Sequence, residues 1–188
     1  MPTEVLAGVM VGTAKAPLPT LRLRRHLEQF VPSSKSLSRS VPSTVTATTI
    51  VSSLLSVQTP GASFVDLTAE IANFVTDARA AEGAVTLFIR HTSASLTIQE
   101  NADPSVLDDL MTALGRLAPA NAGWSHETEG PDDMPAHIKT MLTATSLQIP
   151  VLRGKLALGT WQAIYLIEHR TQPHRREIVL QFIGLTSS

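Results

Sequence analysis

Two stretches of the chain repeat apolar residues at the spacing of an α-helix. The first predicts a helix over about residues 66–80, which Ser63 or Asp66 can cap. The second begins at Asp103-Pro104, where Asp suits the N-cap and Pro suits the first helical position. The predicted buried face of the first helix consists of Leu67, Ile71, Phe74, Val75 and Ala78. That of the second consists of Leu107, Leu110, Met111, Leu114 and Leu117.

The remaining apolar segments are short and rich in β-branched residues, which favours strands. They lie at residues 41–59, 84–89, 96–99, 147–151, 156–158, 163–167 and 176–183. Arg153-Gly154-Lys155 separates two of these segments and predicts a hairpin. Strands at hairpin spacing beside two main helices predict an α+β fold. We expect a compact sandwich of largely antiparallel or mixed β-sheet.

Residues 1–40 have a different character from the rest of the chain. They show no sustained strand or helix pattern, and residues 1–41 contain six Lys or Arg against two Glu. Such a basic, Ser-rich segment is typical of an organelle transit peptide, of a disordered tail, or of a start codon placed too early. We therefore predict an N-terminal extension over residues 1–40 and one domain over residues 41–188.

Composition excludes several classes of protein. With 43% hydrophobic and 16% charged residues, the chain can bury a core. It contains no Cys, so any metal must bind His, Asp or Glu, and a reducing compartment such as the cytoplasm is expected. A net charge of −1 predicts no nucleic-acid partner. No apolar run reaches 18 residues, so no membrane association is expected.

Residues 126–139 concentrate polar chemistry, with two His and four acids beside one Gly and two Pro. A Gly-Pro turn can fold His126 and His137 toward one point, and His91, which follows a strand, could join them. Neutral imidazoles are good ligands for zinc. Solvated loop histidines are the alternative interpretation, because the spacing matches no short metal motif.

The four acids of this stretch also allow two interpretations. Asp132 or Asp133 is expected to cap a short helix over residues 136–141, with Pro135 in its first turn. Glu127 or Glu129 could instead act as a ligand or a base.

Two further polar segments are expected to meet residues 126–139 at one site, namely residues 90–95 and residues 159–162 together with 168–170. Hydroxyls of Thr92 and Ser93 suit a phosphate group, unless they only satisfy a turn. A Ser nucleophile is disfavoured, because no Gly-x-Ser-x-Gly elbow is present. Glu168 at a strand end is predicted to pair with Arg170 or Arg175, or to act as a general base.

Several long motifs together resemble the YjbQ-like family, also called secondary thiamine-phosphate synthase. The similarity covers about residues 43–184 and rests on residues 91–96, 100–104, 129–139 and 159–162, together with Glu168 and Arg170. The resemblance implies an α+β fold, a homotrimer and a polar pocket that holds a metal or an anion.

The resemblance also implies roles for individual residues. A divalent metal ion, zinc or magnesium, would be held by His91, His126 and His137. Catalytic roles would fall to His91, His137 and Glu168. A phosphorylated small molecule would be bound by Thr92, Ser93, Lys139, Thr160 and Arg170.

The implied activity joins a hydroxymethylpyrimidine pyrophosphate to a thiazole phosphate and releases pyrophosphate. Two other functions stay open from the sequence. A metal-dependent hydrolase of a phosphorylated small molecule would use the same histidines to activate water. A non-catalytic trimeric binding protein would use the polar loop to order its interface.

Overall fold

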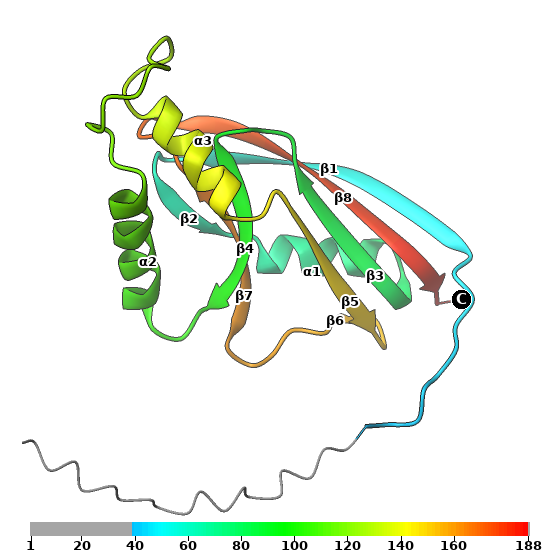
Figure 1. Ribbon diagram of the computed structural model, residues 1–188. Coiled ribbons are helices and arrows are strands. Elements are labelled where there is room, and N and C mark those ends of the chain that lie inside the picture. The colour runs from blue at the N-terminus through cyan, green and yellow to red at the C-terminus, as the bar shows by residue number, and fades with distance from the viewer. Residues whose placement is uncertain (1–38, 188) are drawn as a thin grey trace, which may run out of the picture. The chain divides into compact units, whose positions relative to one another are not determined.

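The computed structural model describes residues 39–187, so most of the predicted N-terminal extension lies outside the described residues. These residues form two sheets and three helices, whose arrangement is drawn in Figure 1. In chain order the elements are β1 (Thr49–Thr59), β2 (Ser63–Asp66), α1 (Thr68–Asp77), β3 (Ala80–Ile89), β4 (Ala94–Glu100), α2 (Pro104–Leu117), α3 (Asp133–Leu142), β5 (Ser146–Leu152), β6 (Lys155–Leu156), β7 (Gln162–Glu168) and β8 (His174–Thr186). The predicted α+β class is therefore confirmed, and all strand pairs are antiparallel.

The larger sheet has the strand order β1-β8-β3-β5-β6. Its central strands alternate inward apolar residues with outward residues, as a sheet with one covered face requires. In β8 the inward positions include Ile178, Leu180 and Phe182. Helix α1 packs against β3 and β8 of this sheet and also against β7 of the other, and its Ile71, Phe74 and Val75 are buried.

The smaller sheet has the order β2-β7-β4, and helix α3, which carries part of the site described below, packs against β4. Its middle strand β7 is buried at every position after Gln162. Apolar residues of β7 and β4, including Ile164, Leu166 and Leu96, belong to the same core cluster as α1 and the larger sheet. The chain therefore has one continuous core, and the polar ends of β4 and β7 are fixed by packing.

The predicted hairpin is confirmed at residues 152–155. Strand β5 pairs with β6, with Leu152 opposite Lys155. The two turn residues Arg153 and Gly154 have φ values of 51° and 76°. Two left-handed residues give the type I′ geometry that suits the right-handed twist of a hairpin.

The predicted helices form, but one prediction about their burial is wrong. Helix α2 begins as expected, with the Asp103 carboxylate accepting a hydrogen bond of 2.9 Å from Ser105 N–H. Its apolar stripe, however, is only half-buried or exposed, and Leu117 is 65% exposed. Figure 1 shows why, because α2 lies at the edge of the fold and is not enclosed between the sheets.

The short helix predicted near residue 136 exists as α3, a third helix. Asp132 occupies its N-cap position, but no side chain caps the helix. The Asp132 carboxylate instead accepts hydrogen bonds from Thr171 N–H and Oγ1–H, at 2.7 Å and 2.9 Å. The capping role predicted for Asp132 or Asp133 is therefore wrong, because tertiary contacts use both carboxylates. Among the helices of residues 39–187, none is long and apolar enough to span a membrane.

Candidate metal and substrate site

Helix α3 places Asp133 and His137 on one face, one turn apart. Residues four positions apart on a helix are neighbours, and here His137 Nε2 lies 3.5 Å from Asp133 Oδ2. Asp133 is buried, whereas the His137 side chain is 34% exposed. The first turn of α3 thus presents a carboxylate and an imidazole toward one point.

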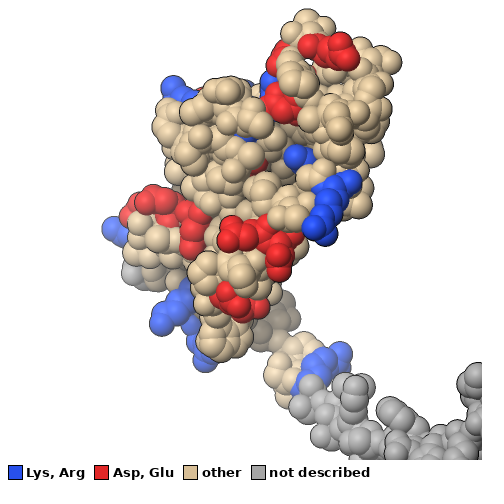
Figure 2. All heavy atoms as spheres, turned by 90° about the vertical axis from the view of Figure 1, so that its left-hand side faces the viewer, with Lys and Arg blue, Asp and Glu red and all other residues tan. Residues whose placement is uncertain are grey.

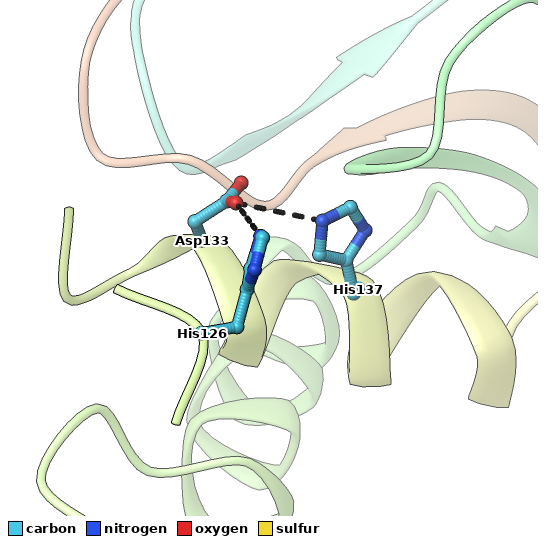
Figure 3. A group of neighbouring side chains, drawn as sticks. All are labelled: His126, Asp133 and His137. Atoms are coloured by element: carbon cyan, nitrogen blue, oxygen red, sulfur yellow. Dashed lines mark hydrogen bonds and ion pairs between the residues drawn. The ribbon is translucent and has the colours of Figure 1, made fainter. Parts of the chain in front are cut away.

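His126 completes the group from the loop before α3. Its Nε2 lies 2.8 Å from the same Asp133 Oδ2 (Figure 3), and the two imidazole centroids are 5.5 Å apart. One ligand atom from each of the three residues lies within 4.8 Å of the other two. The loop therefore folds back as predicted and brings His126 beside His137, with Asp133 between them.

Neighbouring groups hold two of these three side chains in the orientation that a metal ligand needs. His137 Nδ1 donates to the Thr92 carbonyl at 3.0 Å, which leaves Nε2 with its lone pair. Asp133 Oδ1 accepts from Arg170 NH1 at 2.6 Å, which leaves Oδ2 free to bind a cation. Such outer partners fix the tautomer and orientation of metal ligands.

The donor set fits a first-row divalent ion such as zinc. Two imidazoles and one carboxylate are the three protein ligands of many catalytic zinc sites, and of non-haem iron sites. The His126 side chain is 49% exposed, so one side of the group is open to water or substrate. Magnesium fits poorly, because it prefers oxygen ligands.

Two exposed acidic residues lie in the loop that carries His126. Exposed Glu127 and Glu129 lie in the loop before α3, at the top of Figure 1. Red carboxylates gather at the same height in Figure 2. A local cluster of negative charge raises the concentration of cations near the site.

His91 is placed near this group but not in it. The third member of the converging group is Asp133 and not His91, so the structure does not bring the ligand atoms of His91, His126 and His137 together as one group. Nδ1 of His91 is occupied by Ser93, whose N–H and Oγ lie 3.1 Å and 3.0 Å away. His91 and His137 instead line one cavity of about 420 Å³.

Glu168 is fully buried and its carboxylate is saturated. Arg176 donates two hydrogen bonds of 2.7 Å to it, and Thr59 Oγ1 and Arg170 N–H donate two more. Burial raises the pKa of Glu168, but these hydrogen bonds outweigh that effect and lower its pKa. The pairing with Arg170 or Arg175 was the wrong prediction, and a general base is not supported, because no lone pair faces a cavity.

Three predicted phosphate ligands are placed elsewhere. Arg170 is buried and binds Asp132, Asp133 and the Glu129 carbonyl, so its guanidinium holds the loop and not a ligand. Lys139 does not line the cavity of His91 and His137, and burial lowers its pKa. Thr160 is exposed before β7, whereas Arg170 follows β7.

The prediction that all three polar segments meet is therefore wrong for residues 159–162. Strand β7 has seven residues, and at about 3.3 Å per residue its ends lie roughly 20 Å apart. Figure 1 places the loop before β7 at the opposite end of that strand from the loop that leads into β8. Trp161, in that loop, is 63% exposed.

Comparison with known proteins assigns the family. The profile of UPF0047 YjbQ-like proteins matches residues 53–185, which is most of the chain. The chain belongs to the YjbQ-like family. A UPF0047 protein of Synechocystis is 47% identical over 132 residues, covering 70% of this chain and 90% of its own. YjbQ of Escherichia coli O157:H7 is 44% identical over 119 residues, covering 63% of this chain and 86% of its own.

Solved YjbQ-like structures have the same fold. A protein of this family from Clostridium acetobutylicum superposes with a TM-score of 0.64 at 35% identity, over 69% of this chain and 98% of its own. A YbjQ-like protein of unknown function from Sulfolobus solfataricus gives a TM-score of 0.66 at 22% identity, over 73% of this chain and all of its own. The α+β architecture with curled antiparallel sheets is thus shared within the family.

Sequence reasoning missed two site residues, Asp133 and Arg176. A signal for Asp133 was its spacing of four from His137, which places both on one face once the predicted helix over residues 136–141 begins at Asp133. The signal for Arg176 was its alternation with Ile178 and Leu180, which places it on the inward face of β8. An inward charge in a strand requires a buried partner, and Glu168 is that partner.

Proposed function

We propose that this YjbQ-like protein is a metal-dependent enzyme that acts on a phosphorylated small molecule. The observation that carries the proposal is the open group of His126, Asp133 and His137, whose Nε2 and Oδ2 atoms converge. A divalent ion in such a site polarises a phosphate oxygen or lowers the pKa of bound water. The adjoining cavity of about 420 Å³ offers space for a substrate beside His137.

The more specific proposal is thiamine-phosphate synthesis, as the family resemblance implies. In that reaction a thiazole nitrogen attacks the methylene carbon of a pyrimidine pyrophosphate. The carbon–oxygen bond breaks, and pyrophosphate leaves with the electron pair. Groups that neutralise the departing charge accelerate such a step, and the positioned donors of the cavity suit that role.

In this proposal some residues bind the metal and others hold these ligands in place. His126, Asp133 and His137 supply the ligand atoms, and Arg170 orients Asp133. The Thr92 carbonyl fixes His137. The buried pair of Glu168 and Arg176 supports the segment that carries His91, since Arg176 NH2 lies 3.5 Å from Ser93 Oγ.

Metal content of Asp133→Asn tests the metal site directly. We expect near-stoichiometric metal in the wild type and less than a tenth of it in the variant, because a neutral amide is a poor ligand. Glu127→Gln is the matched control, since Glu127 neighbours His126 in sequence but lies outside the group. Metal-free wild-type protein that also fails to take up added zinc would refute the proposal.

Product analysis separates synthase from hydrolase. Incubation with both precursors should yield thiamine phosphate and pyrophosphate if the synthase proposal holds. Release of phosphate from several phosphate esters, with no need for a thiazole, would assign a metal-dependent hydrolase instead. A protein with bound metal but no turnover of either kind would be a binding protein.

We also propose that the chain assembles as a homotrimer. Apolar side chains on the outer face of the larger sheet support this, because Ile50, Leu54 and Phe88 are 67%, 51% and 49% exposed. Light scattering should give three times the chain mass of 20.2 kDa, and Leu54→Glu should lower it. A monomeric wild type would contradict the proposal.

We propose a cytoplasmic location for the protein. The absence of Cys supports a reducing compartment. Fluorescent fusions of residues 1–188 and of residues 41–188 should show the same cytoplasmic distribution. Organelle import of the longer fusion alone would assign a transit peptide to residues 1–40.

A further inference from the structure

His91 differs from the metal-binding histidines in the partners of its ring. The backbone N–H of Ser93 can only donate, and it lies 3.1 Å from His91 Nδ1. Nδ1 must therefore accept, which places the ring proton on Nε2. His137 has the opposite arrangement, because its Nδ1 donates to the Thr92 carbonyl. The Nε2 atoms of the two histidines therefore differ. His137 Nε2 offers a lone pair, whereas His91 Nε2 carries the ring proton and can donate a hydrogen bond.

A buried network reinforces this arrangement at His91. Arg176 NH2 lies 3.5 Å from Ser93 Oγ and donates toward it, so the Ser93 hydroxyl is left to donate to His91 Nδ1 at 3.0 Å. Arg176 is itself fixed by the two hydrogen bonds to Glu168. Ser93 and Arg176 are 1% and 2% exposed, so water does not compete strongly for these contacts.

His91 lines two neighbouring cavities. His91, Thr92 and Thr145 line both the cavity of about 420 Å³ and a second cavity of about 410 Å³. The first also includes His137, and the second also includes Arg90. Within residues 39–187, the hydroxyls of Thr92 and Thr145 form no hydrogen bond. The lining that these cavities share therefore gathers hydrogen-bond donors between the metal group and a cationic side chain.

We propose that His91 is a substrate-binding donor and not a metal ligand, and that its Nε2–H binds the phosphate or pyrophosphate group of the substrate. The free hydroxyls of Thr92 and Thr145 add donors to the same oxygens, and Arg90, which pairs with Glu177 at 2.9 Å, lies beside them. This inference rests on the proposed metal-dependent function, since it assigns the anion site beside the metal group. It predicts that substitution of His91 leaves the metal content unchanged and weakens the binding of the anion.

Two substitutions distinguish the roles of the two ring nitrogens of His91. The amide nitrogen of Gln reaches the position of Nε2, whereas Asn reaches only the position of Nδ1. Metal content and pyrophosphate affinity would be measured for His91→Gln and His91→Asn in the full chain, by elemental analysis and titration calorimetry. Thr160→Ala serves as the control, because Thr160 lies at the far end of β7.

We expect both variants to carry as much metal as the wild type. Pyrophosphate should bind about tenfold or more weakly to His91→Asn, as expected for loss of a hydrogen bond to a charged group, and within about threefold of wild type to His91→Gln. Thr160→Ala should match the wild type. Long-range ¹H–¹⁵N spectra of the wild type should report the Nε2–H tautomer for His91.

Three results would overturn the inference. Metal loss in both His91 variants would make His91 a ligand. Equal pyrophosphate affinity in all proteins, or no pyrophosphate binding by the wild type, would remove the anion site. Failure of the metal proposal is distinguishable, because it appears as a metal-free wild type or as unchanged metal content in Asp133→Asn.

Discussion

At the scale of single residues, the charge of Glu168 depends on Arg176. Both side chains are almost completely buried, and the pair is joined by two hydrogen bonds of 2.7 Å. Breaking a buried pair leaves an uncompensated charge in a medium of low polarity. The loss of stability on substitution therefore reflects the cost of this unpaired buried charge, and not the strength of the ion pair itself.

Glu168→Gln should therefore lower the free energy of unfolding by about 3–5 kcal/mol. Glu177→Gln is the matched control, because Glu177 pairs with Arg90 at 2.9 Å on the surface, where a pair contributes less than about 1 kcal/mol. Urea denaturation at neutral pH measures both. Equal small losses would show that Glu168 is not the structural partner described here.

His169 makes the stability of the protein sensitive to acid. It is 2% exposed, its Nε2 lies 2.8 Å from Ser95 Oγ, and its Nδ1 has no partner within the described chain. Burial, together with the charges of Lys139 and Arg176, lowers the pKa of His169 to about 4, although Glu168 opposes them. The folded protein thus holds this imidazole neutral where the unfolded chain protonates it.

The pH window follows from these two pKa values. Between about pH 6.5 and pH 4 the unfolded state binds more protons, so the free energy of unfolding falls as the pH falls, by roughly 3 kcal/mol in total. Asp132, with a pKa of about 2, contributes a separate loss below about pH 3.8. Denaturation of His169→Gln across this range should show a clearly smaller loss between pH 6.5 and 4 than the wild type, in which His91, whose pKa burial also lowers, contributes to the loss. A wild-type stability that stays flat from pH 6.5 to 4 would contradict the assignment.

At the scale of elements, the sequence of α2 predicted where the helix begins but not how much of it is buried. Its start at Asp103-Pro104 could be predicted because capping is local chemistry. Its burial could not, because an apolar stripe does not specify which surface covers it. The hairpin around Arg153-Gly154 was predicted for the same local reason, although its type I′ geometry was not, and the four-residue strand β2 was too short to show a pattern.

The loose packing of α2 predicts a small cost for truncating its apolar face. Leu114→Ala should lower the free energy of unfolding by less than about 1 kcal/mol, since Leu114 is only partly buried. Leu87→Ala, in the centre of β3, should cost about 2–5 kcal/mol. Urea denaturation compares the two. A cost at Leu114 as large as at Leu87 would mean that α2 is covered, and light scattering of the same variant would show whether a partner subunit covers it.

At the scale of the whole molecule, the site depends on contacts between distant segments. The Gly-Pro turn predicted that His126 and His137 meet, because they lie only eleven positions apart in the sequence. The contribution of Asp133 depends on Arg170, which reaches α3 from the loop after β7. No local pattern encodes that contact. The same long-range topology separates Thr160 from the site, although the two ends of β7 are close in sequence.

The arrangement also explains why neighbouring polar side chains take different roles. Arg170 and Arg176 are both buried cations. Each forms an ion pair with a carboxylate, Arg170 with Asp133 and Arg176 with Glu168. The groups left facing solvent and the cavities are the imidazoles of His126, His137 and His91. The chemistry therefore belongs to three histidines and one aspartate, and the two buried arginines support them.

The most direct test of this account is anomalous X-ray scattering from crystals of the zinc-loaded protein. We predict a zinc peak about 2.0–2.2 Å from His126 Nε2, Asp133 Oδ2 and His137 Nε2, with His91 Nε2 outside ligand distance. A peak bound to His91 would contradict the ligand set. Absence of any peak, with His126 still hydrogen-bonded to Asp133, would contradict the metal centre itself.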